Sequence, residues 1–220
     1  MENSIAQTET RKARRAYHMK RFAFLKESLR HFKTVGTVTR SSRYLSRGVV
    51  RQAKISEAKV VVELGAGDGV MTRHILKTLP ADAVLFSFEV NAQFCKQMMK
   101  INDPRLKIIN LSAEKLPEVI GKYGFHQVDA VISALPFSVF PLDLTYTIVG
   151  HSFDVLKENH RFVQIHYSLK TKKIYSQIFG NIKSFFEFRN IPPAFILVCE
   201  KQSITKGIVR EHANHLHTHH

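Results

Sequence analysis

Three glycines follow an acid in the stretch VVELGAGDGV, residues 61–70. They are Gly65, Gly67 and Gly69. Glycine lets the backbone turn sharply after the apolar run that contains Glu63, and lets it approach a ligand closely. A helix predicted over residues 69–78 would direct its N-terminal amide groups at a ligand in this turn. The spacing differs from the G-x-G-x-x-G of dinucleotide-binding proteins, so the turn predicts a nucleotide-type site of another kind.

A second acid, Glu89, ends the apolar run LFSFEV, twenty residues after Gly69. A carboxylate at this position can accept hydrogen bonds from both hydroxyls of a ribose. In a doubly wound sheet the carboxyl ends of neighbouring strands meet at one crevice, which would bring Glu89 to the glycine turn. The alternative is that Glu89 only caps the helix that follows it.

The elements that must position these residues begin at about residue 59, where short apolar runs alternate with amphipathic ones. This alternation predicts an α/β fold with a parallel sheet covered by helices. The predicted strands are 59–64, 83–89, 106–110, 128–133 and 160–167, and the predicted helices are 69–78, 91–101, 114–122 and 142–157. The runs SFFEFRN and PAFILVCEK follow with no helix between them, so they predict an antiparallel hairpin. The expected fold is a doubly wound, Rossmann-like seven-stranded sheet with an antiparallel last strand.

Basic residues are concentrated before this sheet. Between Arg11 and Lys54 there are fourteen Lys or Arg and a single acid, Glu27, in a chain whose net charge is +15. Residues 11–33 predict a basic amphipathic helix, which is typical of a membrane-interface element. Such a block indicates a polyanionic partner, either nucleic acid or an anionic lipid surface. Packing of the helix on the domain, or a solubilising tail, remain the alternatives.

Several classes of protein are disfavoured by the sequence. No apolar run reaches the 18 to 20 or so residues that cross a bilayer, and the N-terminus lacks the features of a secretory signal. We therefore expect a cytoplasmic protein. Cys95 and Cys199 fit no metal-binding spacing, so we expect reduced, buried thiols and no metal site. The His-rich end is expected to be a disordered tail.

With these residues in place, the chain resembles the class I S-adenosylmethionine-dependent methyltransferases over residues 59–201. The resemblance implies that S-adenosylmethionine is the cofactor and that Glu89 binds its ribose. It assigns the cofactor's methionine and ribose to the loop Glu63–Gly69, Ala66 included. In NLSAEKL, the adenine-contacting segment, Ser112 replaces the family's usual Asp, and Ala113 would contact the ring through its backbone.

The segment VISALPF at the fourth strand distinguishes two groups within this class. Methyltransferases that act on base amines, such as the ribosomal RNA adenine dimethyltransferases, have N-[IL]-P-[YF] there. Ala134 replaces the Asn, which removes the hydrogen-bond acceptor for the amine, although Phe137 could still stack on a base. Bacterial phospholipid N-methyltransferases are more similar, because they have S-[GA]-L-P.

Three further segments match that second group: VGTVTRSS, VQIHYS and the NIPPA that begins at Asn190. The matches depart from the family pattern at Ala134, where many members have Gly, at Arg40, where they have Pro, and at Ser168, where they have Gly. The resemblance places Ser133, Ala134 and Leu135 beside the cofactor. It also makes residues 35–42 a lid that closes over the cofactor and brings Ser41 and Ser42 to it.

The implied reaction is methylation of the ethanolamine amine of phosphatidylethanolamine at an anionic phospholipid membrane surface. An amine with a pKa near 10.4 must lose a proton before it attacks. Tyr167 and His166 are the candidate catalytic residues, of which strand alternation turns only one inward, and the family favours Tyr167. His166 as the base and purely structural roles for both remain open.

These inferences predict three regions: a basic membrane-contact and lid region (1–57), a cofactor-binding methyltransferase domain (58–202) and a His-rich tail (203–220). The expected enzyme is cytoplasmic and peripherally membrane-associated, and the sequence indicates no protein partner. Two alternatives stay open, namely a ribosomal RNA or other nucleic-acid base methyltransferase and a non-catalytic binding protein that keeps only the cofactor fold.

Overall fold

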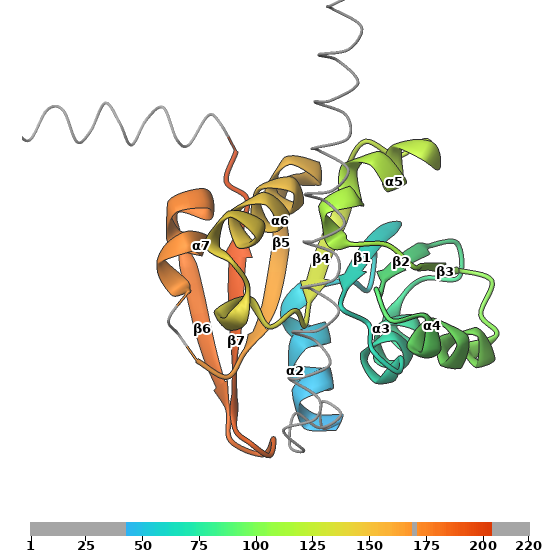
Figure 1. Cartoon of the computed structure of the whole chain (residues 1–220), viewed down its shortest axis with the longest axis horizontal. Coiled ribbons are helices and arrows are strands. Elements are labelled where there is room, and N and C mark those ends of the chain that lie inside the picture. The colour runs from blue at the N-terminus through green and yellow to red at the C-terminus, as the bar shows by residue number, and fades with distance from the viewer. Residues whose placement is uncertain (1–42, 169–170, 204–220) are drawn as a thin grey trace, which may run out of the picture.

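The fold is a seven-stranded sheet in the order β3-β2-β1-β4-β5-β7-β6, with helices on both faces (Figure 1). The computed structural model describes residues 43–168 and 171–203. The strands are β1 (Val60–Leu64), β2 (Val84–Phe88), β3 (Leu106–Ile109), β4 (Val128–Ser133), β5 (Leu156–His166), β6 (Ile182–Glu187) and β7 (Ala194–Glu200). The helices are α2 (Arg43–Ala53), α3 (Val70–Thr78), α4 (Ala92–Met98), α5 (Leu116–Lys122), α6 (Leu142–Val155) and α7 (Lys172–Phe179), and the short 3-10 turns are η1 (Met99–Ile101), η2 (Ala113–Lys115) and η3 (Phe137–Val139).

Five strands are parallel, and β7 runs antiparallel to both of its neighbours, β5 and β6. The predicted fold, including the terminal antiparallel hairpin, is therefore confirmed. The order 3-2-1-4-5 places the carboxyl ends of β1 and β4 side by side at the point where the strand order reverses. Ligands of doubly wound sheets bind at this point.

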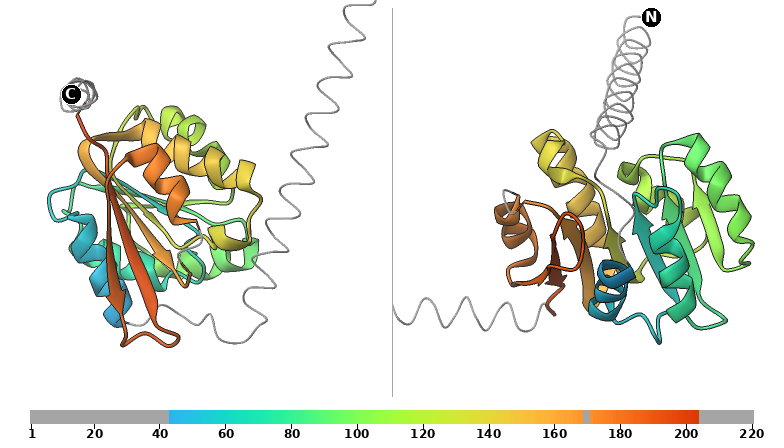
Figure 2. Two further views of the ribbon diagram at one scale, coloured as in Figure 1. Left: turned by 90° about the vertical axis from the view of Figure 1, so that its left-hand side faces the viewer. Right: turned by 90° about the horizontal axis from the view of Figure 1, so that it is seen from below.

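Both faces of the sheet are buried, as expected of parallel strands covered by helices. Side chains such as Val62 and Leu64 pack under α5, α6 and α7. Val61 and Ala130 point the other way and pack against α2 and α3. The two helical layers are visible on opposite sides of the sheet in Figure 2.

Helix α2 was not predicted as an element, and it packs directly on the sheet. Its residues Leu45, Val49 and Ala53 are buried in the same cluster as β1 and β5. A Cβ on Gly48 would lie 2.9 Å from Cδ1 of Ile196, so a glycine at this position lets α2 approach β7 closely. Residues 43–53 therefore belong to the folded layer that begins the α/β unit.

Part of the predicted N-terminal region cannot be compared with the structure. The predicted helix 11–33, the lid 35–42 with Ser41 and Ser42, and the tail beyond residue 203 lie outside the described residues. Within residues 43–168 and 171–203, no helix has the length and apolarity that a bilayer-spanning segment needs. In the same ranges, no cluster of His, Cys, Asp and Glu side chains forms a candidate metal site.

Candidate cofactor and substrate site

The glycine turn follows β1 in a backbone conformation that other residues rarely adopt. Gly65, Gly67 and Gly69 have φ angles of +79°, +60° and +85°. A Cβ at Gly65 would lie 2.9 Å from Cδ2 of Leu135, so the turn lies against the segment that follows β4. The amide of Ala134 donates to the carbonyl of Leu64 at 2.9 Å, so a backbone hydrogen bond also joins the segment after β4 to the end of β1.

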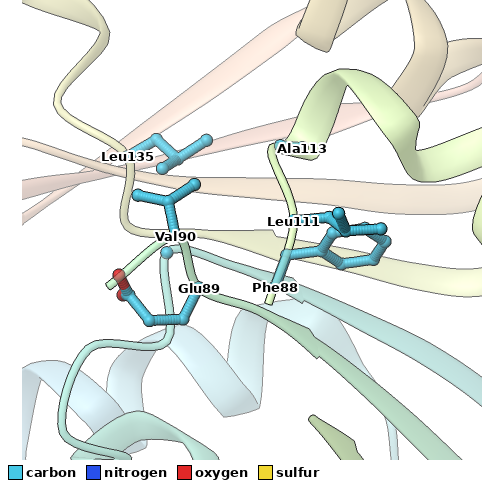
Figure 3. A pocket seen from close by; sticks show the side chains of 7 residues that line it. Phe88, Glu89, Val90, Leu111, Ala113 and Leu135 are labelled. Atoms are coloured by element: carbon cyan, nitrogen blue, oxygen red, sulfur yellow. The ribbon is translucent and has the colours of Figure 1, made fainter. Parts of the chain in front are cut away.

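Glu89 lies at the carboxyl end of β2 and is directed towards this turn (Figure 3). Its side chain is buried, and its two oxygens accept hydrogen bonds from the amides of Gly67 and Asn91, each at 2.8 Å. These contacts fix the carboxylate in place. Because an ionised carboxylate has about four acceptor positions, Glu89 retains acceptor capacity for two hydroxyls.

A pocket opens beside Glu89, between the ends of β1, β2, β3 and β4 (Figure 3). It is lined by Gly65, Phe88, Glu89, Val90, Leu111, Ala113 and Leu135. The walls are apolar and the carboxylate is the only charged group among the lining residues. This arrangement suits a ligand with a flat, apolar ring system and a neighbouring pair of hydroxyls.

Ser112 and Ala113 follow β3 at the rim of the pocket. Ala113 lines the pocket, and its backbone contact with the adenine ring stays a prediction. The Ser112 hydroxyl donates to Oε2 of Glu114 at 3.1 Å and accepts from the Glu114 amide at 3.4 Å, so it caps the turn η2. A direct contact between Ser112 and an adenine edge therefore stays a prediction, and it would compete with these two hydrogen bonds.

Glu63 occupies a different environment from Glu89, under helix α3. The hydroxyls of Thr72 and Ser87 both donate to its Oε2 at 2.7 Å, whereas Oε1 is buried and has no hydrogen-bond partner among the described residues. Burial raises the pKa of this carboxyl to about 7. A buried acceptor without a partner costs free energy, which a polar group of a bound ligand would offset.

The segment after β4 places its small and apolar groups at the site. Ser133 is buried and its hydroxyl accepts from the Leu135 amide at 3.3 Å, while Ala134 is exposed. Phe137 is 1% exposed, and its ring packs edge-on against Phe140 and Tyr175. The possibility that Phe137 stacks on a base is therefore not supported, because neither face of its ring is open.

His166 and Tyr167, at the end of β5, point to opposite faces of the sheet, as strand alternation requires. His166 is buried against α7, where Nε2 lies 2.8 Å from the Tyr175 hydroxyl, and burial lowers its pKa to about 4. Tyr167 is half-buried beside α2, and burial raises its pKa although a side-chain hydrogen bond with Asn190 opposes this effect. The structure thus joins two of the matched segments, VQIHYS and NIPPA, through one contact.

Gln164 is a residue of this site that the sequence analysis missed. It is fully buried in β5, and its Nε2 donates to the carbonyl of Leu135 at 2.9 Å. This hydrogen bond connects β5 to the segment after β4 and holds that segment in place. A polar residue inside the apolar run FVQIH was the available signal, as Ser87 inside LFSF was for the Glu63 cluster.

The comparisons with known proteins agree with this geometry. A model of the ribosomal RNA adenine dimethylase family matches residues 41–176, which is more than half of the chain. The chain belongs to this family. It is therefore a class I S-adenosylmethionine-dependent methyltransferase, and S-adenosylmethionine is its cofactor.

Individual relatives differ in what they act on. The ornithine lipid N-methyltransferase of Singulisphaera acidiphila is 29% identical over 181 residues, which cover 81% of this chain and 94% of that protein. A putative rRNA-methylase of Clostridium thermocellum has a TM-score of 0.54 and 16% identity, over 76% of this chain and 98% of that one. A 16S rRNA methyltransferase of T. thermophilus, solved with AdoMet and guanosine, has a TM-score of 0.56 and 19% identity, over 77% of this chain and 45% of that one. The two structures establish a shared fold.

The residues present fit this cofactor. When bound, S-adenosylmethionine supplies an electrophilic methyl group together with its own leaving group. Glu89 has acceptor capacity for the ribose hydroxyls, and the apolar walls formed by Phe88, Leu111 and Leu135 suit the adenine ring. The unsatisfied Oε1 of Glu63 is a further acceptor at the same strand ends.

Proposed function

We propose that this enzyme methylates the amine of a membrane lipid head group, with phosphatidylethanolamine as the substrate. In this proposal the enzyme works on the cytoplasmic side of an anionic membrane to which it binds peripherally. The segment after β4 is the observation that supports the proposal most directly.

A base methyltransferase must hold an exocyclic amine by an acceptor and stack the base. At the corresponding position this chain has Ala134, which has no side-chain acceptor, and the Phe137 ring is buried. A flexible lipid amine needs neither a stacking ring nor an in-plane acceptor. The likeness to a lipid N-methyltransferase that covers most of both chains supports the same choice.

The protein must position the amine and exclude competing water, since the cofactor supplies the leaving group. We assign Tyr167 to the ammonium head group. Its raised pKa keeps the phenol protonated at neutral pH, so its oxygen can accept a hydrogen bond and its ring face can attract a cation. His166 is neutral at the same pH, but its Nε2 is occupied by Tyr175, so we assign it to the support of the β5 end.

Nucleic-acid base methylation remains the second candidate, because the family model that matches the chain describes ribosomal RNA enzymes. The basic block would then contact phosphates.

Methyl-labelled S-adenosylmethionine separates these candidates. The protein is incubated with vesicles that contain phosphatidylethanolamine, with ornithine lipid, and with ribosomal RNA, and the label is followed into each. We expect label in the lipid amine, and a loss of at least about tenfold in cofactor affinity for Glu89→Gln, which replaces a charged acceptor. The matched control is Glu118→Gln, on the exposed face of α5, which should bind the cofactor normally. Label in RNA alone would refute the proposal.

A further inference from the structure

The turn between β6 and β7 presents large apolar side chains to solvent. Phe186 is 58% exposed, Phe188 is 69% exposed and Ile191 is 82% exposed, all within six residues. Single exposed apolar residues are ordinary on a protein surface, but a contiguous group indicates an interaction site. We name residues 186–191 the hairpin tip.

The hairpin tip lies at the edge of the sheet that holds the cofactor site. Because β7 is antiparallel to β5, with Phe195 opposite His166, the turn before β7 extends beyond the carboxyl end of β5 (Figure 1). The hydrogen bond between Asn190 and Tyr167 joins the tip to the residue that we assign to the head group. The hairpin tip and the cofactor site therefore both lie at the carboxyl ends of the parallel strands.

Cations surround the base of the tip. The guanidinium carbons of Arg189 and Arg43 lie 4.6 Å and 5.0 Å from the centre of the Tyr44 ring, and Arg47 is exposed on the same helix. Both Nε and a terminal nitrogen of Arg189 donate to the carboxylate of Glu187, at 2.9 Å and 3.0 Å. We name Arg43, Arg47 and Arg189 the collar. Even when the negative charge of Glu187 is counted, the collar is positively charged.

The combination of an aromatic tip and a cationic collar identifies the kind of partner. Membrane-interface elements place aromatic and aliphatic side chains at the acyl boundary and basic side chains among anionic head groups. Aromatic side chains beside cations also occur in single-stranded RNA sites, but Ile191, the most exposed of the three apolar side chains, has no ring on which a base could stack. Arg43 and Arg47 also belong to the basic block of residues 11–54, so two of the three arginines are part of that block.

We propose that the hairpin tip inserts into the head-group layer of an anionic lipid bilayer, with Arg43, Arg47 and Arg189 on the lipid phosphates. This inference rests on the proposed function, since it places a lipid substrate at the site. Insertion of Phe188 and Ile191 would bring the carboxyl end of β5, and Tyr167 with it, to the level of the head groups. The substrate amine could then reach the crevice without leaving the bilayer.

The chain contains no tryptophan, so a single introduced tryptophan reports on its own surroundings. The test uses the full chain with Phe188→Trp and vesicles of phosphatidylethanolamine and phosphatidylglycerol, some with brominated acyl chains. Met99→Trp is the matched control. Met99 is 67% exposed, and it follows α4, which packs on β3 at the opposite edge of the sheet from β6.

When vesicles are added, we expect the tryptophan fluorescence of Phe188→Trp to shift to the blue and to be quenched by the brominated acyl chains. We expect neither change for Met99→Trp. A second variant, Phe188→Asp, should bind the vesicles about tenfold more weakly, because one aromatic side chain no longer leaves water and a negative charge is added. Its circular dichroism and cofactor affinity should be unchanged, since Phe188 is exposed and lies outside the pocket.

Absence of a shift at residue 188, or equal shifts at both positions, would overturn the inference. So would a shift without lipid that grows with protein concentration, which would indicate a second copy, or a shift caused only by RNA. The test is independent of turnover. If the tip inserts but no lipid amine is methylated, the proposed function fails and the membrane contact stands.

Discussion

Two buried acids at neighbouring strand ends show how surroundings set the chemistry of the same functional group. Glu89 accepts from two backbone amides, one at each carboxylate oxygen. Glu63 accepts only from two hydroxyls at one oxygen, and burial dominates, so its pKa is raised to about 7. The sequence placed both acids at the ends of their strands, but no motif singles out Thr72 and Ser87, whose hydroxyls donate to Glu63 and oppose the rise in its pKa.

Glu63→Gln should therefore change stability in a pH-dependent way. With a usual pKa of 4.5 when unfolded and about 7 when folded, Glu63 binds a proton in the folded state between these values. Its contribution to the free energy of unfolding is full below about pH 4.5 and is lost as the pH rises to about 7. Because glutamine does not titrate, the free energy of unfolding of the variant should rise relative to that of the wild type by up to about 3 kcal/mol between pH 4.5 and pH 8. Urea unfolding at several pH values measures this, and a pH-independent difference would contradict it.

Tyr167→Phe tests the assignment of the head group to this side chain. The change removes the hydroxyl and its hydrogen bond with Asn190 while it keeps the ring. We expect kcat for the lipid substrate to fall by about 10- to 100-fold with an unchanged cofactor affinity.

His166→Gln is the comparison for that variant. We expect a clear loss in the free energy of unfolding and only a small change in kcat, since His166 contacts Tyr175 in the core. If both variants lost only stability, the two residues would be structural.

At the scale of elements, the sequence predicted all seven strands and four of the described helices. Alternation and apolar runs suffice for buried strands such as VVVEL, which is buried throughout. Two helices, α2 and α7, were missed. In α2 three arginines and an internal Gly48 conceal the buried positions, and its place in a basic block favoured a lid instead. Helix α7 has only eight residues, so its hydrophobic periodicity is short.

The pocket walls were predicted only in part for a related reason. Gly65, Glu89 and Ala113 belong to recognisable motifs, and the structure brings them together. Phe88, Val90 and Leu111 also line the pocket, but apolar residues at strand ends have no distinguishing pattern in a sequence. Their role depends on how neighbouring strands are aligned.

The glycine turn gives a prediction at this scale. Gly65→Ala should destabilise the protein by about 2 kcal/mol or more, because Gly65 has φ +79° and the added Cβ would meet Leu135 at 2.9 Å. Gly121→Ala is the matched control. It lies inside α5 with no atom within 4 Å of the added Cβ, so it should be neutral or stabilise by up to about 1 kcal/mol. Chemical unfolding of both variants measures this, and equal effects would argue against a strained turn.

At the scale of the whole molecule, charge is distributed unevenly. The net charge of +15 comes mostly from residues 11–54, so the remainder of the chain is close to neutral. If this block contacts anionic lipid, binding should weaken steeply between about 0.05 M and about 0.5 M salt, because screening shortens the Debye length. Vesicle flotation at several salt concentrations measures this. Phosphatidylcholine vesicles are the control, and equal salt dependence on both would exclude an electrostatic contact.

The reversed direction of β7 has a consequence for substrate choice. Had the final strand run parallel to β5, its preceding connection would have opened on the far side of the sheet, away from the crevice. Reversal instead leaves a short loop beyond the carboxyl end of β5, on two strands that contribute no residue to the described pocket. We therefore expect changes of length or composition in that loop to alter which acceptor molecule can approach, while the pocket beside Glu89 keeps its shape.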